Sequence, residues 1–287
     1  MGVFDGVHRG HRAVLEVTRA AAFTSVAIVF DPHPDEVIRG IVVPRLAPPT
    51  VNLERIRAVG IDFALPLHFD DGLRALRPEE FLDAIAPAIE IRTLVMTRQS
   101  AFGKGRTGTA ARMAEIGPER GFEVVAIEPQ QLDGEVVSSS RVRAAIGAGD
   151  LEAATELLGC APYLEGTVVV GDRRGRELGF PTANLAFGYL PALPPLGIYV
   201  GRVAVPERGV GPGHPALVSV GVRPTFHSQG DLLVEVNLLD WDGDLYGARL
   251  QLDLLTRLRD ERRFDGVNAL ITQMRRDEAD ARRRLDM

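Results

Sequence analysis

The fold of the second half of this 287-residue sequence is decided by the stretch Gly175-Arg176-Glu177-Leu178-Gly179-Phe180-Pro181-Thr182-Ala183-Asn184. Its glycines permit tight turns and close approach of a ligand to the backbone, because glycine has no Cβ. Pro181 fixes its own φ and favours an extended Phe180. In an extended chain the Thr182 hydroxyl and the Asn184 amide share one face, where their oxygens suit Mg²⁺. Composition alone favours a simpler interpretation, a Gly/Pro turn with a polar rim.

Composition indicates a globular protein with one large or two ordinary domains, because 45% of the residues are hydrophobic and 25% are charged. No apolar segment is long enough to cross a bilayer, so we expect no membrane partner. The net charge of −6 gives no support for nucleic-acid binding. Cys160 is the single cysteine, which excludes an internal disulfide and predicts a reducing cytoplasm. Lys104 is the single lysine and is followed by Gly105, which excludes a P-loop. No pattern specifies an oligomeric state.

The first half alternates between strand and helix patterns. Continuous apolar runs predict buried strands at 25–30, 63–67, 93–97 and 123–127, and helical spacing predicts helices at 78–89 and 110–120. This alternation is typical of a parallel α/β sheet, which binds its ligands at the carboxyl ends of the strands.

Two polar clusters in this half precede predicted helices. His8 and His11 flank Gly10 just before a helix that runs to about residue 22, so both imidazoles can converge on one anion. The alternatives are two surface histidines or a zinc site, and zinc would need a third ligand from His33 or carboxylates. The second cluster, residues 138–143, offers serine hydroxyls and Arg143 to a polyphosphate, although serines at a helix start are also ordinary caps.

A domain boundary is predicted after the helical pattern at 151–158, which Gly159 ends. Short strand patterns follow at 166–170, 197–205, 216–220, 232–239 and 250–258, which predict a small antiparallel barrel. The last segment, 264–284, predicts an amphipathic helix packed against that barrel. We therefore expect two domains, 1–159 and 160–287.

Three motifs stand out in the first half: G-x-F-D-G-V-H-x-G-H at 2–11, D-P-H-P at 31–34 and S-S-S-x-V-R at 138–143. Together they resemble the adenylyltransferase half of the bacterial bifunctional riboflavin kinase/FMN adenylyltransferase (FAD synthetase) family. The resemblance implies a Rossmann-like nucleotidyltransferase domain. Its ATP site would comprise Gly2, Phe4, Asp5, His8, Gly10, His11, His33, Ser139, Ser140 and Arg143.

The second half resembles the riboflavin kinase half of the same family, through G-x-x-x-G-R-x-L-G-F-P-T-A-N-L at 171–185 and shorter motifs at 197–199, 221–226, 235–240, 245–247 and 259–264. Glu235 would be the base that accepts the proton of the ribityl 5′-hydroxyl, and Thr182 and Asn184 would bind Mg²⁺. The ATP site would comprise Gly171, Arg176, Gly179, Thr182 and Asn184. Arg259, Glu261 and Phe264 would lie against the flavin, and Phe264 is equally well explained as a core residue.

The first half departs from the family pattern in two respects. Gln99 and Ser100 stand where the family has an acidic residue and an aromatic one, and serine cannot stack on an isoalloxazine ring. The phosphate-binding turn also begins at Gly2, which leaves no residues for the strand that should precede it. We expect a reading frame that starts upstream of Met1, and unpaired ladder groups on the neighbouring strand.

The resemblance implies that ATP phosphorylates riboflavin to FMN and that a second ATP adenylylates FMN to FAD, with release of pyrophosphate. It implies Mg²⁺ as the cofactor and small molecules as the partners. One alternative is a riboflavin kinase with a degenerate first domain, which Gln99 and Ser100 favour. Another is a flavin-binding or RNA-binding regulator. The acidic balance argues against RNA, and the combination of Thr182, Asn184 and Glu235 argues against a pure binding module.

Overall fold

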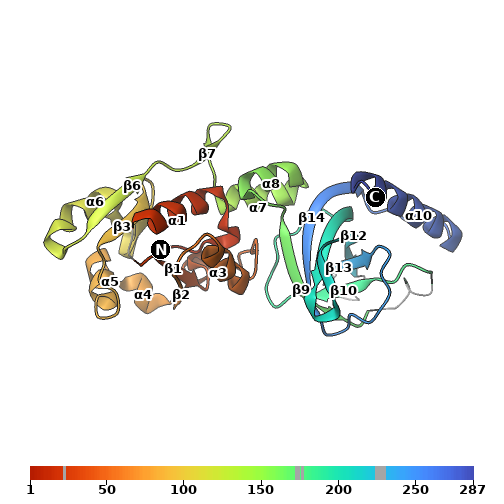
Figure 1. Cartoon of the computed structure of the whole chain (residues 1–287), viewed down its shortest axis with the longest axis horizontal. Coiled ribbons are helices and arrows are strands. Elements are labelled where there is room, and N and C mark those ends of the chain that lie inside the picture. Colours follow the sequence, from red (N-terminus) through yellow and green to blue (C-terminus); the bar gives the residue numbers. More distant parts are fainter. Residues whose placement is uncertain (22–23, 172–174, 176–177, 224–230) are drawn as a thin grey trace. The chain divides into compact units, whose positions relative to one another are not determined.

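The computed structural model describes residues 1–21, 24–171, 175, 178–223 and 231–287 (Figure 1). The contacts among these residues divide the chain into two compact units. One unit comprises residues 1–43 and 48–139, and the other comprises 44–47 and 140–287. The predicted boundary at residue 159 stays a prediction.

The first unit is built on pairs of parallel strands, with helices between them (Figure 1). β1 pairs with β2 and β3 pairs with β6, each in parallel. Its helices are α1 (Arg9–Ala21), α2 (Pro34–Arg39), α3 (Pro49–Ala58), α4 (Asp71–Ala75), α5 (Pro78–Ile85) and α6 (Ala110–Ile116). Its strands are β1 (Val26–Asp31), β2 (Phe63–His68), β3 (Thr93–Thr97), β4 (Ala101–Phe102), β5 (Gly108–Thr109), β6 (Glu123–Ile127), β7 (Gln131–Leu132) and β8 (Glu135–Val136). Its 3₁₀ turns are η1 (Asp5–Val7), η2 (Lys104–Arg106) and η3 (Pro118–Arg120).

Two helices of this unit are shorter than predicted because proline ends them. α5 stops at Ile85: Ala86 still has a helical backbone, but Pro87 has no N–H to continue the hydrogen-bond ladder. α6 stops at Ile116, and Pro118 then begins the separate turn η3. The four predicted strands are present within a residue of their expected limits.

In the part of the chain that the structure describes, β1 and β3 are not paired with each other, and the segment at Gly2 pairs with β1 at one position only. Gly2 forms an isolated parallel bridge with Val29, in which its N–H donates to Ile28 O at 3.0 Å and its carbonyl accepts from Phe30 N–H at 2.9 Å. A cavity of about 600 Å³ is lined by Met1 and by residues of both strands. The parallel strands of the described residues therefore form two pairs, β1 with β2 and β3 with β6, where we expected one sheet. The strand expected upstream of Gly2 stays a prediction.

The second unit is a closed antiparallel barrel in which six of the described strands follow the order β10-β13-β12-β11-β14-β9 (Figure 1). The strands are β9 (Tyr163–Val169), β10 (Ala183–Ala186), β11 (Gly197–Val205), β12 (Val210–Arg223), β13 (Asp231–Leu238) and β14 (Arg249–Arg259). The described residues of this unit also include the turn η4 (Pro206–Arg208), the helices α8 (Leu151–Leu158) and α10 (Val267–Arg284), and all but the first residue of α7 (Ser139–Ala148). Valine and leucine side chains fill the barrel, as alternation along the strands predicts.

Helix α10 packs on the outside of the barrel. Ala281 and Leu285 form a small apolar cluster with Val200 of β11 and with Leu239. The helix begins at Val267, three residues later than predicted, so Phe264 lies in the segment that precedes it. That segment connects the end of β14 to α10 and borders the cavity described below.

Candidate functional site

The turn that carries the first histidine is strained and firmly held. Phe4 and Val7 have positive φ values of 52° and 46°, which side chains other than glycine rarely adopt. Gly6 N–H donates to the buried Asn52 Oδ1 of α3 at 3.0 Å, and the Arg55 guanidinium donates to Gly6 O at 3.1 Å. Such strain costs about 1–3 kcal/mol per residue and persists where surrounding contacts enforce it, commonly at ligand sites.

His8 and His11 form a stacked pair at the start of α1. Their ring centroids are 3.6 Å apart with an interplanar angle of 15°, and the Phe4 ring lies 5.1 Å from His11. The backbone N–H of His11 donates to the ring Nδ1 of His8 at 3.2 Å. A Cβ on Gly10 would come within 3.1 Å of the His8 ring, so glycine lets the two rings pack this tightly.

The surroundings of the His11 ring disfavour its charged form. Burial, followed by the neighbouring charge of His8, lowers the pKa of His11 well below its ordinary value of 6.5. Its Nδ1 is buried and has no hydrogen-bond partner among the described residues. A buried polar atom without a partner is exceptional in folded proteins and points to a ligand or water.

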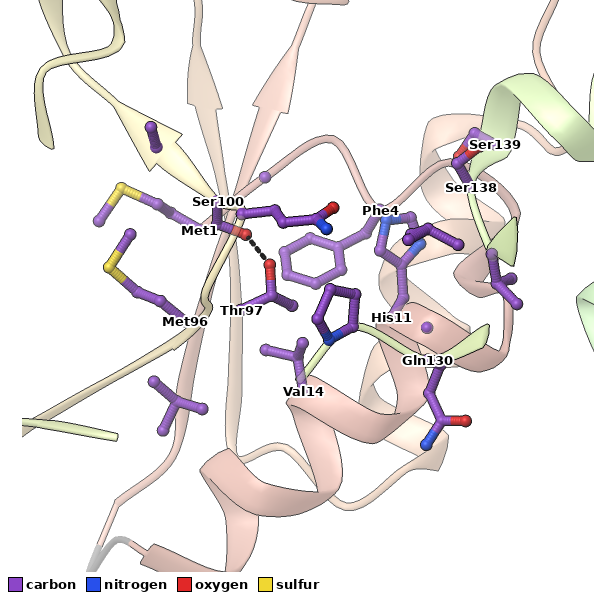
Figure 2. A pocket seen from close by; sticks show the side chains of 18 of the residues that line it. Met1, Phe4, His11, Val14, Met96, Thr97, Ser100, Gln130, Ser138 and Ser139 are labelled. Atoms are coloured by element: carbon purple, nitrogen blue, oxygen red, sulfur yellow. Dashed lines mark hydrogen bonds between the residues drawn. The ribbon is translucent and has the colours of Figure 1, made fainter. Parts of the chain in front are cut away.

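These side chains line a cavity of about 360 Å³ in the first unit (Figure 2). Of the residues predicted for this site, those that line it are Gly2, Phe4, His8, Gly10, His11 and Ser139. Asp5 is buried beside them, and its carbonyl accepts from Ser139 Oγ at 3.0 Å.

The other residues predicted for this site lie outside the cavity lining. His33 caps α2, where its Nδ1 accepts from Asp35 N–H at 3.1 Å. Ser140 and Arg143 lie on α7, and the Arg143 guanidinium contacts Ser140 Oγ at 3.5 Å. Both residues belong to the second unit.

The two departures from the family pattern, Gln99 and Ser100, also line the first cavity. The hydroxyls of Ser100 and Thr97 share a hydrogen bond of 2.6 Å across the end of β3 (Figure 2). Thr97 and Gln130 also line the cavity and were not predicted as site residues, although Thr97 ends a predicted strand. The cavity therefore presents hydroxyl and amide groups where the family pattern has an acid and an aromatic ring.

In the second unit, strand register places the key residues in one row on the outer face of the barrel. Asn184 of β10 is opposite Glu235 of β13, which is opposite Ser219 of β12. Ser219 is opposite Ile198 of β11, which is opposite Arg259 of β14. Residues directly opposite in antiparallel strands point to the same face. The neighbours of Glu235 are buried inside the barrel, as its predicted orientation requires.

Thr182 and Glu235 meet at one end of this row. The Thr182 hydroxyl donates to Glu235 Oε1 at 3.5 Å. The amide of Asn237, two residues further along β13, donates to Pro181 O at 2.7 Å. This bond holds the segment that carries Thr182 against the strand that carries Glu235.

Asn184 lies next to Thr182 in a closely packed corner. It is 5% exposed, and its Oδ1 is buried without a hydrogen-bond partner among the described residues. A Cβ on Gly171 would lie 2.3 Å from Asn184 Nδ2, and one on Gly175 would lie 2.4 Å from Phe180 O. A Cβ at either position would therefore force a neighbouring atom to move. Gly179 has a φ of 85°. Arg176 lies outside the described residues.

A cavity of about 380 Å³ opens beside this row and is walled by α10. Glu235, Thr182 and the three residues predicted to lie against flavin, Arg259, Glu261 and Phe264, all line it. Glu261 approaches the backbone of Gly221 so closely that a Cβ there would lie 2.6 Å from its Oε1. Sequence reasoning missed several lining residues, namely Ser219, Asn237, Leu270, Met274 and Asp277.

Neither a metal cluster nor a membrane-spanning helix is found in the part of the chain that the structure describes. No cluster of three or more histidine, cysteine or carboxylate side chains is placed to hold a metal ion. No helix among these residues has both the length and the apolar character needed to span a membrane.

Comparison with known families assigns each half. The FAD synthetase family matches residues 1–141, and the riboflavin kinase family matches residues 158–285. A crystal structure described as a macrolide-efflux protein from Streptococcus pneumoniae superposes with a TM-score of 0.88 at 29% identity, and the match covers 98% of this chain and 92% of that one.

Curated relatives match over nearly the whole sequence. The bifunctional riboflavin kinase/FMN adenylyltransferase of Listeria monocytogenes is 34% identical, and the alignment covers 98% of this chain and 90% of the relative. The protein of the same name from Pseudomonas fluorescens is 36% identical, with 98% and 91% covered. With both family matches in order along the sequence, this chain belongs to the bifunctional riboflavin kinase/FMN adenylyltransferase family.

Proposed function

We propose that this chain makes FMN from riboflavin and ATP at the barrel cavity, and FAD from FMN and a second ATP at the cavity of the first unit. The observation that carries the first activity is that Thr182 and Glu235 contact each other in the lining of one cavity, with Asn184 opposite Glu235 on the neighbouring strand. The stacked pair of His8 and His11 supports the second activity. We assign the two activities to residues 160–287 and 1–159.

In the kinase step, Glu235 accepts the proton of the ribityl 5′-hydroxyl. The hydroxyl oxygen then forms a bond to the γ-phosphorus of ATP, and the bond from that phosphorus to the β–γ bridging oxygen breaks to release ADP. Proton acceptance by a positioned carboxylate contributes on the order of 10²–10⁴-fold. Arg259, Glu261 and Phe264 would hold the flavin on the α10 side of the same cavity.

The rim of this cavity fits Mg²⁺ bound together with ATP. The buried Asn184 Oδ1 has no partner among the described residues, and the Thr182 hydroxyl is adjacent, so both offer the hard oxygen atoms that Mg²⁺ prefers. When bound, Mg²⁺ would neutralise charge on the phosphate oxygens. Gly171, Gly179 and Arg176 would complete the ATP site.

In the adenylylation step, a phosphate oxygen of FMN forms a bond to the α-phosphorus of ATP, and pyrophosphate leaves. The imidazole N–H groups of His8 and His11 would donate to phosphate oxygens, and stabilisation of the charge that develops there is commonly the largest catalytic contribution. Gly2, Phe4, Gly10 and Ser139 would form the surrounding wall, with Asp5 buried beside them. Nucleotide contacts of His33, Ser140 and Arg143 stay sequence-based predictions. Because both reactions consume ATP, we place the protein in the cytoplasm.

A second candidate, a riboflavin kinase with an inactive first unit, is favoured by Gln99 and Ser100 in the first cavity. The deciding experiment incubates the purified protein with riboflavin, ATP and Mg²⁺ and separates the flavins over time by chromatography. Our proposal predicts that FMN appears first and then declines as FAD accumulates. Accumulation of FMN without FAD would support the second candidate, a riboflavin kinase with an inactive first unit. If riboflavin is not converted at all, both candidates are refuted.

A further inference from the structure

Helix α10 contributes one charged group to the kinase cavity that the proposed reaction does not use. Leu270, Met274 and Asp277 lie four and then three residues apart, so they share one helix face, and all three line the cavity. Asp277 is 4% exposed. A buried carboxylate is costly unless it is paired and hydrogen-bonded.

Asp277 is paired with Arg259 in a nearly complete set of hydrogen bonds. Arg259 Nε donates to both carboxylate oxygens, at 2.9 and 3.0 Å, and a terminal guanidinium nitrogen donates to Oδ2 at 2.6 Å. The amide of Gln273 donates to Oδ1 at 2.8 Å. The two charged side chains are 13% and 6% exposed. The Arg259 guanidinium is thus held in one orientation by a partner 18 residues away in the sequence.

The oriented Arg259 in turn organises the segment that follows it. Its other terminal nitrogen donates to Asp260 O at 2.8 Å, and its guanidinium carbon lies 5.9 Å from the centroid of the Phe264 ring. Glu261 and Phe264 both face the cavity. The register of β14 with β11 shifts next to Arg259, and such irregularities re-aim side chains beside functional sites.

We propose that Asp277 is a positioning residue for the flavin substrate. It holds Arg259 so that Arg259, Glu261 and Phe264 present one fixed surface to the isoalloxazine ring. Asp277 acts through Arg259 and does not touch the reacting atoms, which lie with Glu235 and Thr182 at the other end of the row. This role rests on the proposed riboflavin kinase activity.

The test compares Asp277→Asn with Asp240→Asn. Asp240 accepts two bonds from Arg282 of the same helix, but it is exposed and does not line the cavity, so its variant controls for loss of an ion pair that anchors α10. We expect D277N to raise the KM for riboflavin at least about tenfold, because small misplacements of substrate-positioning groups are costly. The KM for ATP should stay within about twofold, and D240N should match the unsubstituted protein in both constants.

Loss of Asp277 leaves a buried cation unpaired and can unfold the protein, so a second variant is needed. Arg259→Met combined with Asp277→Leu removes both charges, a change that folded proteins often tolerate. We expect this variant to fold, as judged by circular dichroism, and to bind riboflavin at least about tenfold more weakly by flavin fluorescence. The proposed role of Asp277 would be overturned if folded D277N kept the KM for riboflavin of the unsubstituted protein. It would also be overturned if the folded double variant bound riboflavin as tightly as the unsubstituted protein does. Absence of riboflavin phosphorylation by the unsubstituted protein would refute the proposed function itself.

Discussion

The Thr182 hydroxyl donates to Glu235 Oε1 at 3.5 Å, which joins the Mg²⁺-binding segment proposed here to the proposed base. The contact connects two residues 53 positions apart in the sequence: Thr182 immediately precedes β10, and Glu235 lies on the neighbouring strand β13. A base beside the phosphate site is what transfer to a bound hydroxyl requires, because the hydroxyl oxygen must face the γ-phosphorus as it loses its proton.

Replacing Glu235 by Gln should reduce riboflavin phosphorylation on the order of 10²–10⁴-fold, the contribution of a general base. The amide keeps the size of the side chain but cannot accept the proton, so ATP affinity should change little. Initial rates and nucleotide binding measured on the same preparation check both statements. Glu207→Gln, which alters a carboxylate outside the cavity lining, should behave like the unsubstituted protein, and full turnover by E235Q would remove Glu235 as the base.

Replacing Gly171 by Ala should impair ATP use at the barrel. The added Cβ would lie 2.3 Å from Asn184 Nδ2, so the Asn184 side chain must move away from its buried position. A displacement of about 1 Å in a positioning group costs on the order of 10²-fold in rate. The matched control is Gly188→Ala, where a Cβ meets no atom within 4 Å. Equal kcat/KM values for ATP in the two variants would contradict a role for Asn184.

Replacing His8 and His11 together by Ala should abolish FAD formation and spare FMN formation. Loss of donors to developing charge costs on the order of 10²–10³-fold, and neither histidine lines the barrel cavity. His68→Ala removes an exposed imidazole of the same unit and serves as the control. An equal fall in both activities of the double variant would show that the sites are not separate.

The stability of the protein should fall in mild acid through His11. Burial lowers the pKa of His11 well below 6.5 in the folded chain, whereas the unfolded chain protonates near that value. The unfolded state therefore binds more protons below pH 6.5, and stability falls there by up to about 1.4 kcal/mol per pH unit until the folded pKa is reached. Nuclear magnetic resonance titration of the ring, assigned with His11→Gln, measures that pKa directly. A pKa of 6.5 or higher would contradict this expectation.

Part of the barrel was predictable because strands such as β13 alternate between buried and more exposed residues. One face of β13 carries Val234 and Val236 into the core, so the orientation of Glu235 followed from the period of two. The strand at 216–220 proved to be the centre of the longer β12, because the polar and proline-containing residues around it are paired by β11 and β13. Tertiary pairing of this kind overrides local propensity.

The supporting residues could not be predicted, because packing and not spacing brings them to the site. Asn237 reaches Pro181 across 56 residues, and Asp277 reaches Arg259 from a separate helix. The opposite case is His33, which a recognisable motif predicts as a site residue but which caps α2 and does not line the cavity. Local patterns describe strands and helices, whereas strand register and helix docking decide which side chains meet.

The measurement that tests the account most directly is FAD formation from FMN by the Glu235→Gln variant. FMN bypasses the kinase step, so only the first unit is needed. We expect E235Q to convert FMN and ATP to FAD at the rate of the unsubstituted protein, with one pyrophosphate released per FAD, and to make almost no FAD from riboflavin. Failure of both proteins to make FAD from FMN would contradict the claim that this chain carries two separate active sites.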